Sequence, residues 1–577
     1  MAVQKAEPVD EAVTPTRPRR DLGPKAPTPR AFRWAALWVL PYLILGISWA
    51  IANPPSAAAD EHNNLIKILA AGRFDIGEKY EGPPGEEVTE IRNNSISRIV
   101  SVPAELEVSD DFFCTAFRPD QTADCLPKEG NNATGVVEQK TAMGAYPVFF
   151  FVPLGWATLL ADNTTRAFHL ARLAEVLMCM TVMLLAVWQL TRWLGRGAAI
   201  GLAVGLTPMA VFHLSTASTV GLEIVGAVAV AAVLITTTRW PESLANRGSL
   251  AVLTVGGTAL ILSRQIGALT FALLAVIALF SGAGPVLWRQ LRHGRPAVII
   301  AAAILAIDTV AIIVWEQLYD HPALTGTVFD QQAWGSFIDG SFVYLRTGVG
   351  YFGWNDTVLP GPFMGLWILL LMVTVGAGML VAKRSDLWRM IVVLLAVGVS
   401  AYAIAAIVFF PIGGGLQGRH MIPMFIVVPM LAGVVLRERW GAGDGRTMRR
   451  FGWFIGVSVA IVHMVAFYIN GQRYAVGWNG PVWWLDEAKW EPRFGWWPWL
   501  IAFAVGCLLL AFNIIRDARV QPNPLLGETV TTGPDDPAIG AQQVDADVAD
   551  DTESAMDKDD SDGRAADSVR RPATSML

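Results

Sequence analysis

The feature that most constrains this chain is a series of apolar stretches that each approach the length of a membrane crossing. A transmembrane helix needs about 20 mostly apolar residues, because the hydrocarbon core of a bilayer is about 30 Å thick. The sequence therefore predicts an all-α polytopic membrane protein with about twelve transmembrane helices. The predicted spans are 33–52, 172–191, 197–213, 219–238, 249–263, 266–282, 297–315, 361–382, 390–410, 421–436, 452–469 and 496–515.

Composition supports this class of protein and excludes others. Of the 577 residues, 53% are hydrophobic and 16% are charged, whereas about 25% are charged in an ordinary soluble domain. The chain has only 4 cysteines, which excludes a small secreted scaffold built from disulfides. Its formal net charge is −6, and no dominant basic face is present, so nucleic acid is not a predicted partner.

The negative net charge comes from one end of the chain. From Gln521 to the C-terminus, 13 acidic residues stand against 4 basic ones, so the rest of the chain is weakly positive. This end has no apolar periodicity and is predicted to be disordered. We therefore divide the chain into a disordered cytoplasmic N-terminus (1–32), a transmembrane domain (33–515) and a disordered acidic cytoplasmic tail (516–577).

The basic residues of the short connectors predict the orientation. Cytoplasmic loops carry an excess of Lys and Arg. The basic connectors all fall on one side if the short apolar stretch Tyr146–Leu160, which contains two prolines, does not cross the membrane. We interpret that stretch as a re-entrant or interfacial segment. Both termini are then cytoplasmic, and 53–145 is a long extracytoplasmic loop with 16 acidic and 8 basic residues.

The cysteines and histidines predict no metal centre. Cys114 and Cys125 lie in the long loop, where an oxidising exterior would allow them to pair. Cys179 and Cys507 lie in apolar spans and are interpreted as packed thiols. Because no His and Cys cluster has metal-ligand spacing, no cofactor is predicted. A carboxylate near the membrane surface could still help to hold a divalent cation.

The most informative residues come shortly after the first span. Asp60, Glu61 and His62 open a short amphipathic segment with apolar residues at helical spacing, which ends at Gly72. The two acids can simply start this helix, because the helix dipole favours negative charge in the first turn. They also lie at the membrane surface, where a carboxylate can act as general base toward an acceptor hydroxyl.

Two arginines break the charge rule on the extracytoplasmic side. Arg264 lies between two predicted spans, and Arg419 lies between two others in a glycine-rich segment that also holds Gln417 and His420. Charges at membrane depth usually face a cavity or a partner, and arginine is suited to bidentate phosphate binding. The alternative is an arginine that extends to the interface or pairs with an internal acid. Because both arginines lie on one face, we favour an anionic ligand.

The remaining charged and aromatic residues indicate a function less specifically. The acids inside or beside the spans can line a proton or ion path or pair within the bundle; they are Asp162, Glu175, Glu223, Asp308 and Glu316. No Walker loop, serine nucleophile elbow or dinucleotide fingerprint occurs. The aromatic segments 316–360 and 470–495 form either an interfacial belt or a stacking surface for sugar rings.

Three short motifs, taken in order, resemble a known class of protein. They are Pro54-Pro55 followed by Asp60-Glu61-His62, the segment 351–360 with Trp354 and Asp356, and Leu416-Gln417-Gly418-Arg419-His420 followed by Pro423. In this membrane context, residues 33–515 resemble the GT-C class of integral-membrane glycosyltransferases, and most closely the bacterial family of domain of unknown function 2142 (DUF2142). That family more often has tyrosine where this chain has His420.

The resemblance implies a location and a set of roles. It implies a bacterial plasma membrane protein that uses a lipid-linked sugar, usually a polyprenyl-phosphate monosaccharide, on the outer face. Asp60, or else Glu61, would activate the acceptor, and Arg264 and Arg419 would hold the donor phosphate. The residues expected to shape the substrate site around them are His62, Trp354, Asp356, Gln417 and His420.

The resulting prediction is an inverting transfer of a sugar from a polyprenyl-phosphate donor to an extracytoplasmic cell-envelope glycan or lipid acceptor. One alternative is a transporter or flippase of a lipid-linked envelope intermediate, which needs no base. Another is a non-catalytic subunit of an envelope-assembly complex. The sequence leaves open whether Asp60, Arg264 and Arg419 meet in space, because they lie far apart in the chain.

Overall fold

The computed structural model describes residues 29–80, 96–127, 133–280, 282–319, 331–406, 416–440, 445–522 and 529–530. These residues all belong to one compact unit, Met1–Thr531. The segments predicted to be disordered, 1–32 and 516–577, lie mostly outside the described residues. The first described helix, α1 (Pro29–Ala52), and the last, α19 (Trp496–Asp517), begin and end near the predicted limits of the transmembrane domain.

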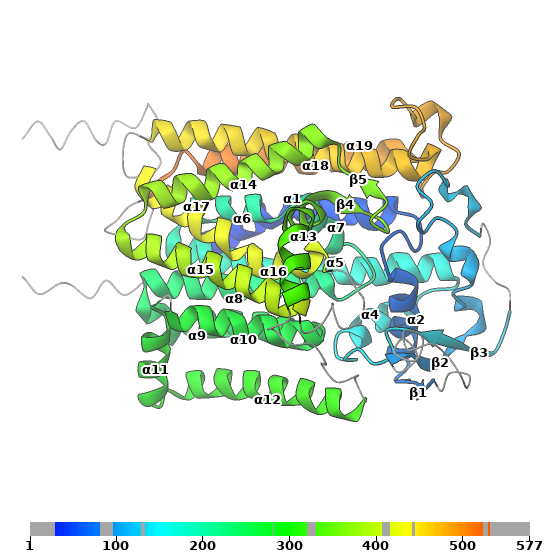
Figure 1. The fold of residues 1–577 in the computed structure, drawn as a ribbon, viewed down its shortest axis with the longest axis horizontal. Coiled ribbons are helices and arrows are strands. Elements are labelled where there is room, and N and C mark those ends of the chain that lie inside the picture. The colour runs from blue at the N-terminus through cyan, green and yellow to red at the C-terminus, as the bar shows by residue number, and fades with distance from the viewer. Residues whose placement is uncertain are drawn as a thin grey trace, which may run out of the picture. The chain divides into compact units, whose positions relative to one another are not determined.

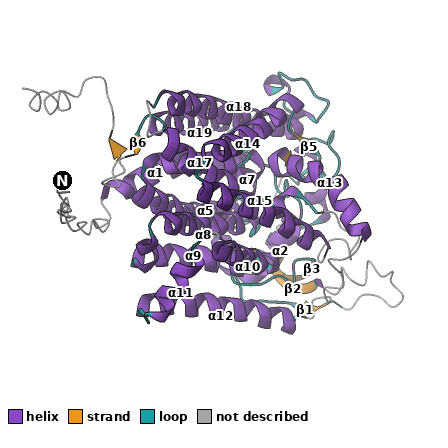
Figure 2. Ribbon diagram, turned by 60° about the vertical axis from the view of Figure 1, so that its left-hand side comes forward, coloured by secondary structure: helices purple, strands orange, loops and turns teal. Residues whose placement is uncertain are grey.

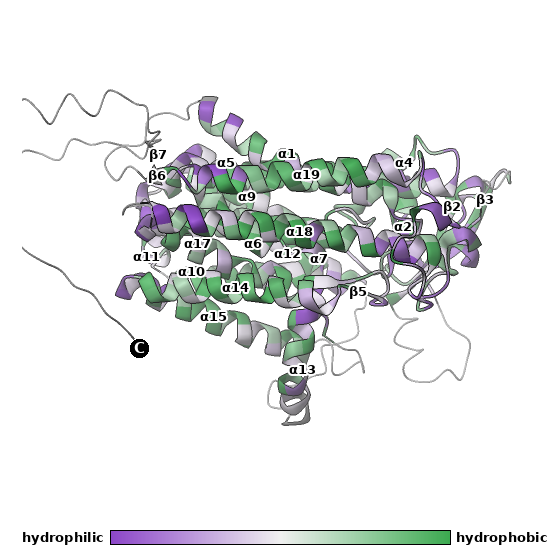
Figure 3. Cartoon of the chain, turned by 90° about the horizontal axis from the view of Figure 1, so that it is seen from above, coloured by the Kyte–Doolittle hydropathy of each residue, from purple (hydrophilic) through white to green (hydrophobic). Residues whose placement is uncertain are grey.

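Eight described helices are long and apolar enough to cross a membrane. They run side by side in Figure 1, and Figure 3 shows hydrophobic residues along their lengths. The prediction of a polytopic, mainly helical membrane protein is therefore confirmed. The eight are α1, α5 (Thr164–Leu194), α8 (Val220–Arg239), α12 (Pro296–Leu318), α14 (Gly361–Val381), α15 (Arg384–Ile404), α18 (Arg446–Val476) and α19.

The other four predicted spans are short, broken or bent, so the described residues give eight long spans, or nine if one bent pair counts as a span. The span expected at 197–213 is split because Pro208 starts a new helix and lacks the N–H needed to continue the preceding one. The span at 197–213 contains α6 (Ile200–Gly205) and α7 (Pro208–His213), and that at 249–263 is α9 (Arg247–Ser263). The span at 266–282 is α10 (Gln265–Phe280), which is followed by α11 (Gly284–Arg292) to form the bent pair. The span at 421–436 contains α16 (Ile422–Phe425) and α17 (Val427–Trp440).

The loop predicted to be extracytoplasmic (53–145) has its own small fold, which the all-α prediction missed. An antiparallel sheet in the order β1-β2-β3 is formed by β1 (Glu78–Lys79), β2 (Arg98–Pro103) and β3 (Val136–Thr141). It packs beside α2 (Glu61–Ala71), whose Leu65, Ile68 and Leu69 are fully buried. Figure 2 shows how few strands accompany the helices; the others are β4 (Tyr351–Phe352), β5 (Thr357–Val358), β6 (Gln521–Pro522) and β7 (Thr529–Val530).

Two further features position the site. The apolar stretch at 146–160 forms only α4 (Phe151–Thr158), 8 residues long, which at 1.5 Å per residue is far too short to cross a bilayer. The aromatic segment after α12 contains α13 (Gln331–Gly350), which lies across the direction of the other helices (Figure 3). It leads into the β4–β5 turn that carries Trp354 and Asp356.

Candidate active site

Asp60 begins α2 without capping it. Its φ of 64° is left-handed, which is uncommon for a residue other than glycine. The Asp60 carbonyl accepts hydrogen bonds from the backbone N–H and the side-chain amide of Asn64, whereas its carboxylate makes no capping hydrogen bond. The acid is therefore not occupied by starting the helix, and its side chain can contact another part of the chain.

That contact is Arg419. Arg419 Nη2 lies 3.3 Å from Asp60 Oδ2, and the two residues are 359 positions apart in sequence. The Asp60 side chain is 42% exposed, while that of Arg419 is 14% exposed. A long contact to a partly exposed acid is a weak ion pair, so the carboxylate remains open to a second molecule.

The glycine-rich segment explains how Arg419 reaches this place. Arg419 lies in a short 3-10 helix, Gly418–His420, and the Gly418 N–H donates to Thr347 Oγ1 of α13 at 2.9 Å. A Cβ atom on Gly418 would lie 2.0 Å from the backbone nitrogen of Gly348. Only glycine permits so close an approach of two backbones, so Gly418 fixes Arg419 against α13.

Arg264 belongs to the same group of charges. It follows the last residue of α9, is 8% exposed, and its Nε lies 3.5 Å from Glu223 Oε2 near the start of α8. Burial lowers the pKa of Arg419, Asp60 raises it, and the charge of Arg264 lowers it again. Arg419 thus lies within electrostatic reach of both Asp60 and Arg264. The sequence alone left this question open.

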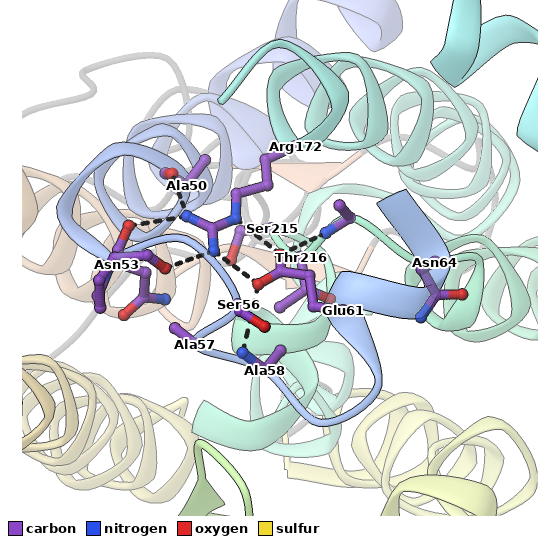
Figure 4. A network of polar contacts seen from close by, with 12 residues as sticks. Ala50, Asn53, Ser56, Ala57, Ala58, Glu61, Asn64, Arg172, Ser215 and Thr216 are labelled. Atoms are coloured by element: carbon purple, nitrogen blue, oxygen red, sulfur yellow. Dashed lines mark hydrogen bonds and ion pairs between the residues drawn. The ribbon is translucent and has the colours of Figure 1, made fainter. Parts of the chain in front are cut away.

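Glu61, next to Asp60, is placed quite differently. It is fully buried and forms a two-pronged ion pair with Arg172 of α5, with Nε to Oε1 at 2.7 Å and Nη2 to Oε2 at 2.6 Å. Figure 4 shows the Arg172 guanidinium between Glu61 and the carbonyls that end α1. The backbone N–H of Ala217 also donates to Glu61 Oε1 at 2.8 Å. These contacts tie α1, α2 and α5 together and favour a structural role for Glu61.

An aromatic cluster lies near the start of α2, where His62 follows Asp60 by two residues. The rings of His62, Phe113, Phe117 and Trp354 have neighbouring centroids 4.8 to 6.3 Å apart. Burial lowers the pKa of His62, although nearby acids raise it, so the ring stays uncharged at neutral pH. Phe117 is 65% exposed and has φ 57°. The disulfide between Cys114 and Cys125 closes the loop that carries Phe117.

Asp356 anchors the turn that carries Trp354. Its Oδ2 accepts a hydrogen bond from Arg473 Nη2 at 3.0 Å, and its Oδ1 accepts one from the Trp354 N–H at 3.2 Å. Arg473 also donates to three carbonyls of the disulfide loop. Asp356 therefore positions the aromatic cluster and does not itself face Asp60. Gln417 and His420 brace the 3-10 helix, since the Gln417 N–H donates to His420 Nδ1 at 3.3 Å.

The other acids found in the sequence have partners in the bundle. Asp162 pairs with Arg166, Thr258 donates to Asp308, and the Leu222 N–H donates to Glu175. These contacts favour pairing over an ion path for these three. Among the described residues, no group of three or more His, Cys, Asp or Glu side chains is arranged to hold a metal ion.

Sequence reasoning missed several residues around the site. Arg172 and Arg473 are both buried arginines on the side predicted to be extracytoplasmic, and applying the charge rule to span ends as well as connectors would have found them. Phe113 and Phe117 flank Cys114 in the long loop. Their sequence carries no signal of a role, because only the folded disulfide loop brings them to Trp354.

Eight long apolar helices define a polytopic membrane protein, and a cluster of charges lies near the start of α2. The chain belongs to the family described as "Predicted membrane protein (DUF2142)", whose model matches residues 43–428. This confirms the family resemblance seen in the motifs. No curated protein matches the sequence.

Two solved structures with some similarity are of ArnT from Cupriavidus metallidurans. The apo state has 16% identity and a TM-score of 0.39, covering 86% of this chain and 77% of that chain. The form bound to undecaprenyl phosphate also has 16% identity, with a TM-score of 0.37, and covers 87% of this chain and 77% of that chain. Similarity at this level establishes nothing about the activity of the present protein.

Proposed function

We propose that this protein is a membrane glycosyltransferase that moves a sugar from a polyprenyl-phosphate donor to an extracytoplasmic cell-envelope glycan or lipid acceptor. The observation that carries the proposal is the contact of one partly exposed carboxylate, Asp60, with Arg419, whose pKa is also affected by the charge of Arg264. The excess of basic residues in the connectors at the opposite end supports an outward-facing site in a bacterial plasma membrane, with both termini cytoplasmic.

The two arginines fit the donor phosphate. Each has one long contact to an acid, at 3.3 Å for Arg419 and 3.5 Å for Arg264, and the Nε of each is buried without a hydrogen bond. Buried guanidinium groups with unused N–H donors favour an anion that accepts several hydrogen bonds. Their positive charge also stabilises the phosphate as it leaves, which is where negative charge develops during the reaction.

Asp60 fits the role of general base. In the proposed step, the acceptor hydroxyl gives its proton to the Asp60 carboxylate and its oxygen bonds to the anomeric carbon of the sugar. The bond from that carbon to the phosphate oxygen breaks, and polyprenyl phosphate leaves with the electron pair. Attack from the face opposite the phosphate inverts the anomeric configuration. Binding of the donor phosphate to Arg419 would release Asp60 from its weak ion pair.

The aromatic cluster fits the acceptor. Phe117 and Phe113 are 65% and 37% exposed, whereas Arg264 is buried among the helix ends. An acceptor that arrives from the aqueous side meets the aromatic rings first, and His62 lies only two residues from Asp60 along the chain. The apolar face of a sugar ring can pack on such rings and present its hydroxyl to the base.

The test is transfer by Asp60→Asn in reconstituted membranes supplied with a labelled polyprenyl-phosphate sugar and a crude envelope acceptor. Loss of a general base costs roughly 10²- to 10⁴-fold in rate, so transfer should fall by at least the lower figure. Asp111→Asn is the matched control, since Asp111 is an exposed acid of the same loop. Full activity of the Asp60 variant would overturn the assignment.

The same assay separates the proposal from its alternatives. A flippase moves the labelled lipid intact across the membrane and releases no sugar from it. A non-catalytic subunit neither cleaves nor moves the donor, and its donor binding does not change when Arg264 and Arg419 are replaced by alanine. Sugar transfer that depends on Asp60 excludes both.

A further inference from the structure

The other end of the bundle carries a helix with a different character. α10 (Gln265–Phe280) is followed after a short break by α11 (Gly284–Arg292), and the two axes differ by 94°. Figure 1 shows α11 lying across the ends of its neighbours, at the end of the bundle opposite α2 and the β1–β3 sheet. If α10 and α12 cross the bilayer, α11 lies in the plane of its surface.

α11 is amphipathic. At 100° per residue, Leu287, Leu291 and Trp288 fall on one side of the helix, and Arg289 falls on the other. Arg292 lies at the boundary, with its guanidinium carbon 6.0 Å from the centre of the Trp288 ring. Trp288 is 63% exposed and Leu287 is 36% exposed. The arginines are exposed as well, together with Arg295 just beyond the helix. An apolar side with a tryptophan and a polar side with arginines are the marks of a helix that lies in a membrane interface.

The arginines of α11 differ from others at the same end of the molecule. Several of those are paired with acids: Arg196 and Arg516 with Asp517, Arg239 with Asp386 and Glu438, and Arg389 with Asp386. Within the described part of the chain, no ion pair involves Arg289, Arg292 or Arg295. Arg292 contacts the ring of Trp288 in the same helix, but among the described residues the three neighbouring positive charges have no acidic partner and can bind an anionic one.

We propose that α11 is an interfacial helix that binds the headgroups of anionic phospholipids in the leaflet at this end of the bundle. Each arginine near an anionic membrane surface contributes to such binding, and the apolar side of the helix inserts at the level of the acyl chains. The inference stands on α11 alone and does not depend on the proposed glycosyltransferase activity.

One other occupant is available within the chain, the acidic C-terminal segment beyond Thr531. The apolar surroundings favour lipid over that segment. Leu279 and Phe280 at the end of α10, and Ile299 and Ile300 near the start of α12, are all strongly exposed. They flank α11 in sequence and continue its apolar side into the lipid-facing surface of the bundle. An acidic peptide would satisfy the arginines but would leave Trp288 and this surface in water.

The test uses the full chain in nanodiscs, with a fluorophore on His293→Cys, an exposed position just after α11. The two free cysteines are buried, so labelling is selective. Quenching by phosphatidylglycerol with a nitroxide on its acyl chain is compared with quenching by the matching phosphatidylcholine. We expect stronger quenching by phosphatidylglycerol, and a roughly fivefold loss of this preference for each arginine removed in Arg289→Gln/Arg292→Gln.

The matched control is Arg449→Gln/Arg450→Gln, which removes the same charge from exposed positions in α18 and should leave the preference unchanged. Equal quenching by the two lipids in the parent protein would overturn the proposal, as would a preference that survives loss of the α11 arginines. A preference that appears only after removal of residues 532–577 would identify the acidic segment as the occupant and would overturn it too.

Discussion

Asp60 and Glu61 are neighbours in sequence and chemically almost identical, yet they lie in opposite environments. Glu61 is fully buried, and both of its oxygens are held by Arg172 at 2.6 to 2.7 Å. Asp60 is 42% exposed and touches Arg419 at 3.3 Å through one oxygen. The first pair joins three helices, whereas the second pair can open for a ligand.

The difference follows from the backbone at the start of α2 and from what surrounds it. Asp60 precedes the helix with a left-handed φ of 64°, whereas Glu61 is the first helical residue, so the two side chains meet different partners. One turns toward α5 and the other toward the 3-10 helix that carries Arg419. Of these two adjacent acids, Glu61 is thus held in a buried ion pair, and Asp60 stays open to a second molecule.

The largest predicted effect tests the structural half of this comparison. Glu61→Ala leaves the Arg172 charge buried without a counterion, which costs about 3–5 kcal/mol of stability. Asp60→Ala removes a partly exposed pair, which is worth no more than about 1 kcal/mol. Denaturation in mixed micelles measures both. The double variant Glu61→Leu/Arg172→Met should recover part of the loss, and equal losses for the two single variants would contradict the comparison.

The next effect concerns Arg419, the ion-pair partner of Asp60. Arg419→Ala should raise the KM for the lipid-linked donor roughly 10- to 150-fold, since hydrogen bonds to a charged group contribute about 1.5–3 kcal/mol. Stability should change little. Arg419→Lys keeps the charge but loses the planar fork of donors. Its KM for the donor should therefore lie between that of the parent protein and that of Arg419→Ala. A donor KM that is unaffected by Arg419→Ala would remove the phosphate from this position.

A smaller effect, on the KM for the acceptor, distinguishes Phe117 from Phe74, an exposed phenylalanine with no proposed role. Phe117→Ala should raise the KM for the acceptor about 2- to 12-fold, given about 0.5–1.5 kcal/mol for an aromatic contact, with the donor KM unchanged. Phe74 is a matched control because it is 74% exposed and also has a left-handed φ of 61°. Identical behaviour of Phe74→Ala would show that exposure, and not contact with Trp354, explains the result.

A pH-dependent effect compares Glu61 with another buried charge of the same helix. Lys67 is fully buried, donates to the Gly144 carbonyl at 2.8 Å, and has its pKa lowered from 10.5 to about 8, mainly by burial. Between these two values the unfolded chain binds more protons than the folded one, so stability rises with pH. The unfolding midpoint of the parent protein, measured relative to that of Lys67→Met, should therefore rise as the pH is raised from 8 to 10. Replacement of the exposed Lys489 serves as the control.

Much of the fold was predictable because long apolar helices depend on local composition. Eight of the twelve predicted spans are long helices, including α5 and α8, whose apolar runs leave no alternative at membrane depth. The four failures are short or broken, as at Pro208, where backbone constraints outweigh apolarity. The small sheet beside α2 was missed because its strands are short and its pairing is non-local.

The candidate site was predictable only in part. Asp60, Arg264 and Arg419 attract attention because charges at a membrane surface are rare and costly. Their grouping depends on contacts between residues far apart in the chain, such as the ion pair of Asp60 with Arg419, 359 positions away, and the approach of Gly418 to Gly348. The partner of Glu61 was invisible because one arginine in a predicted span does not indicate which acid it will meet.

The sequence by itself determined the class of protein, the family and the few charged residues worth attention, because hydrophobicity and charge act locally along the chain. Only the tertiary structure decided which of two adjacent acids is buried and which is open, and which arginine each one meets. Those choices depend on the packing of α2 against α5 and of the Arg419 segment against α13, and no local pattern specifies such long-range contacts.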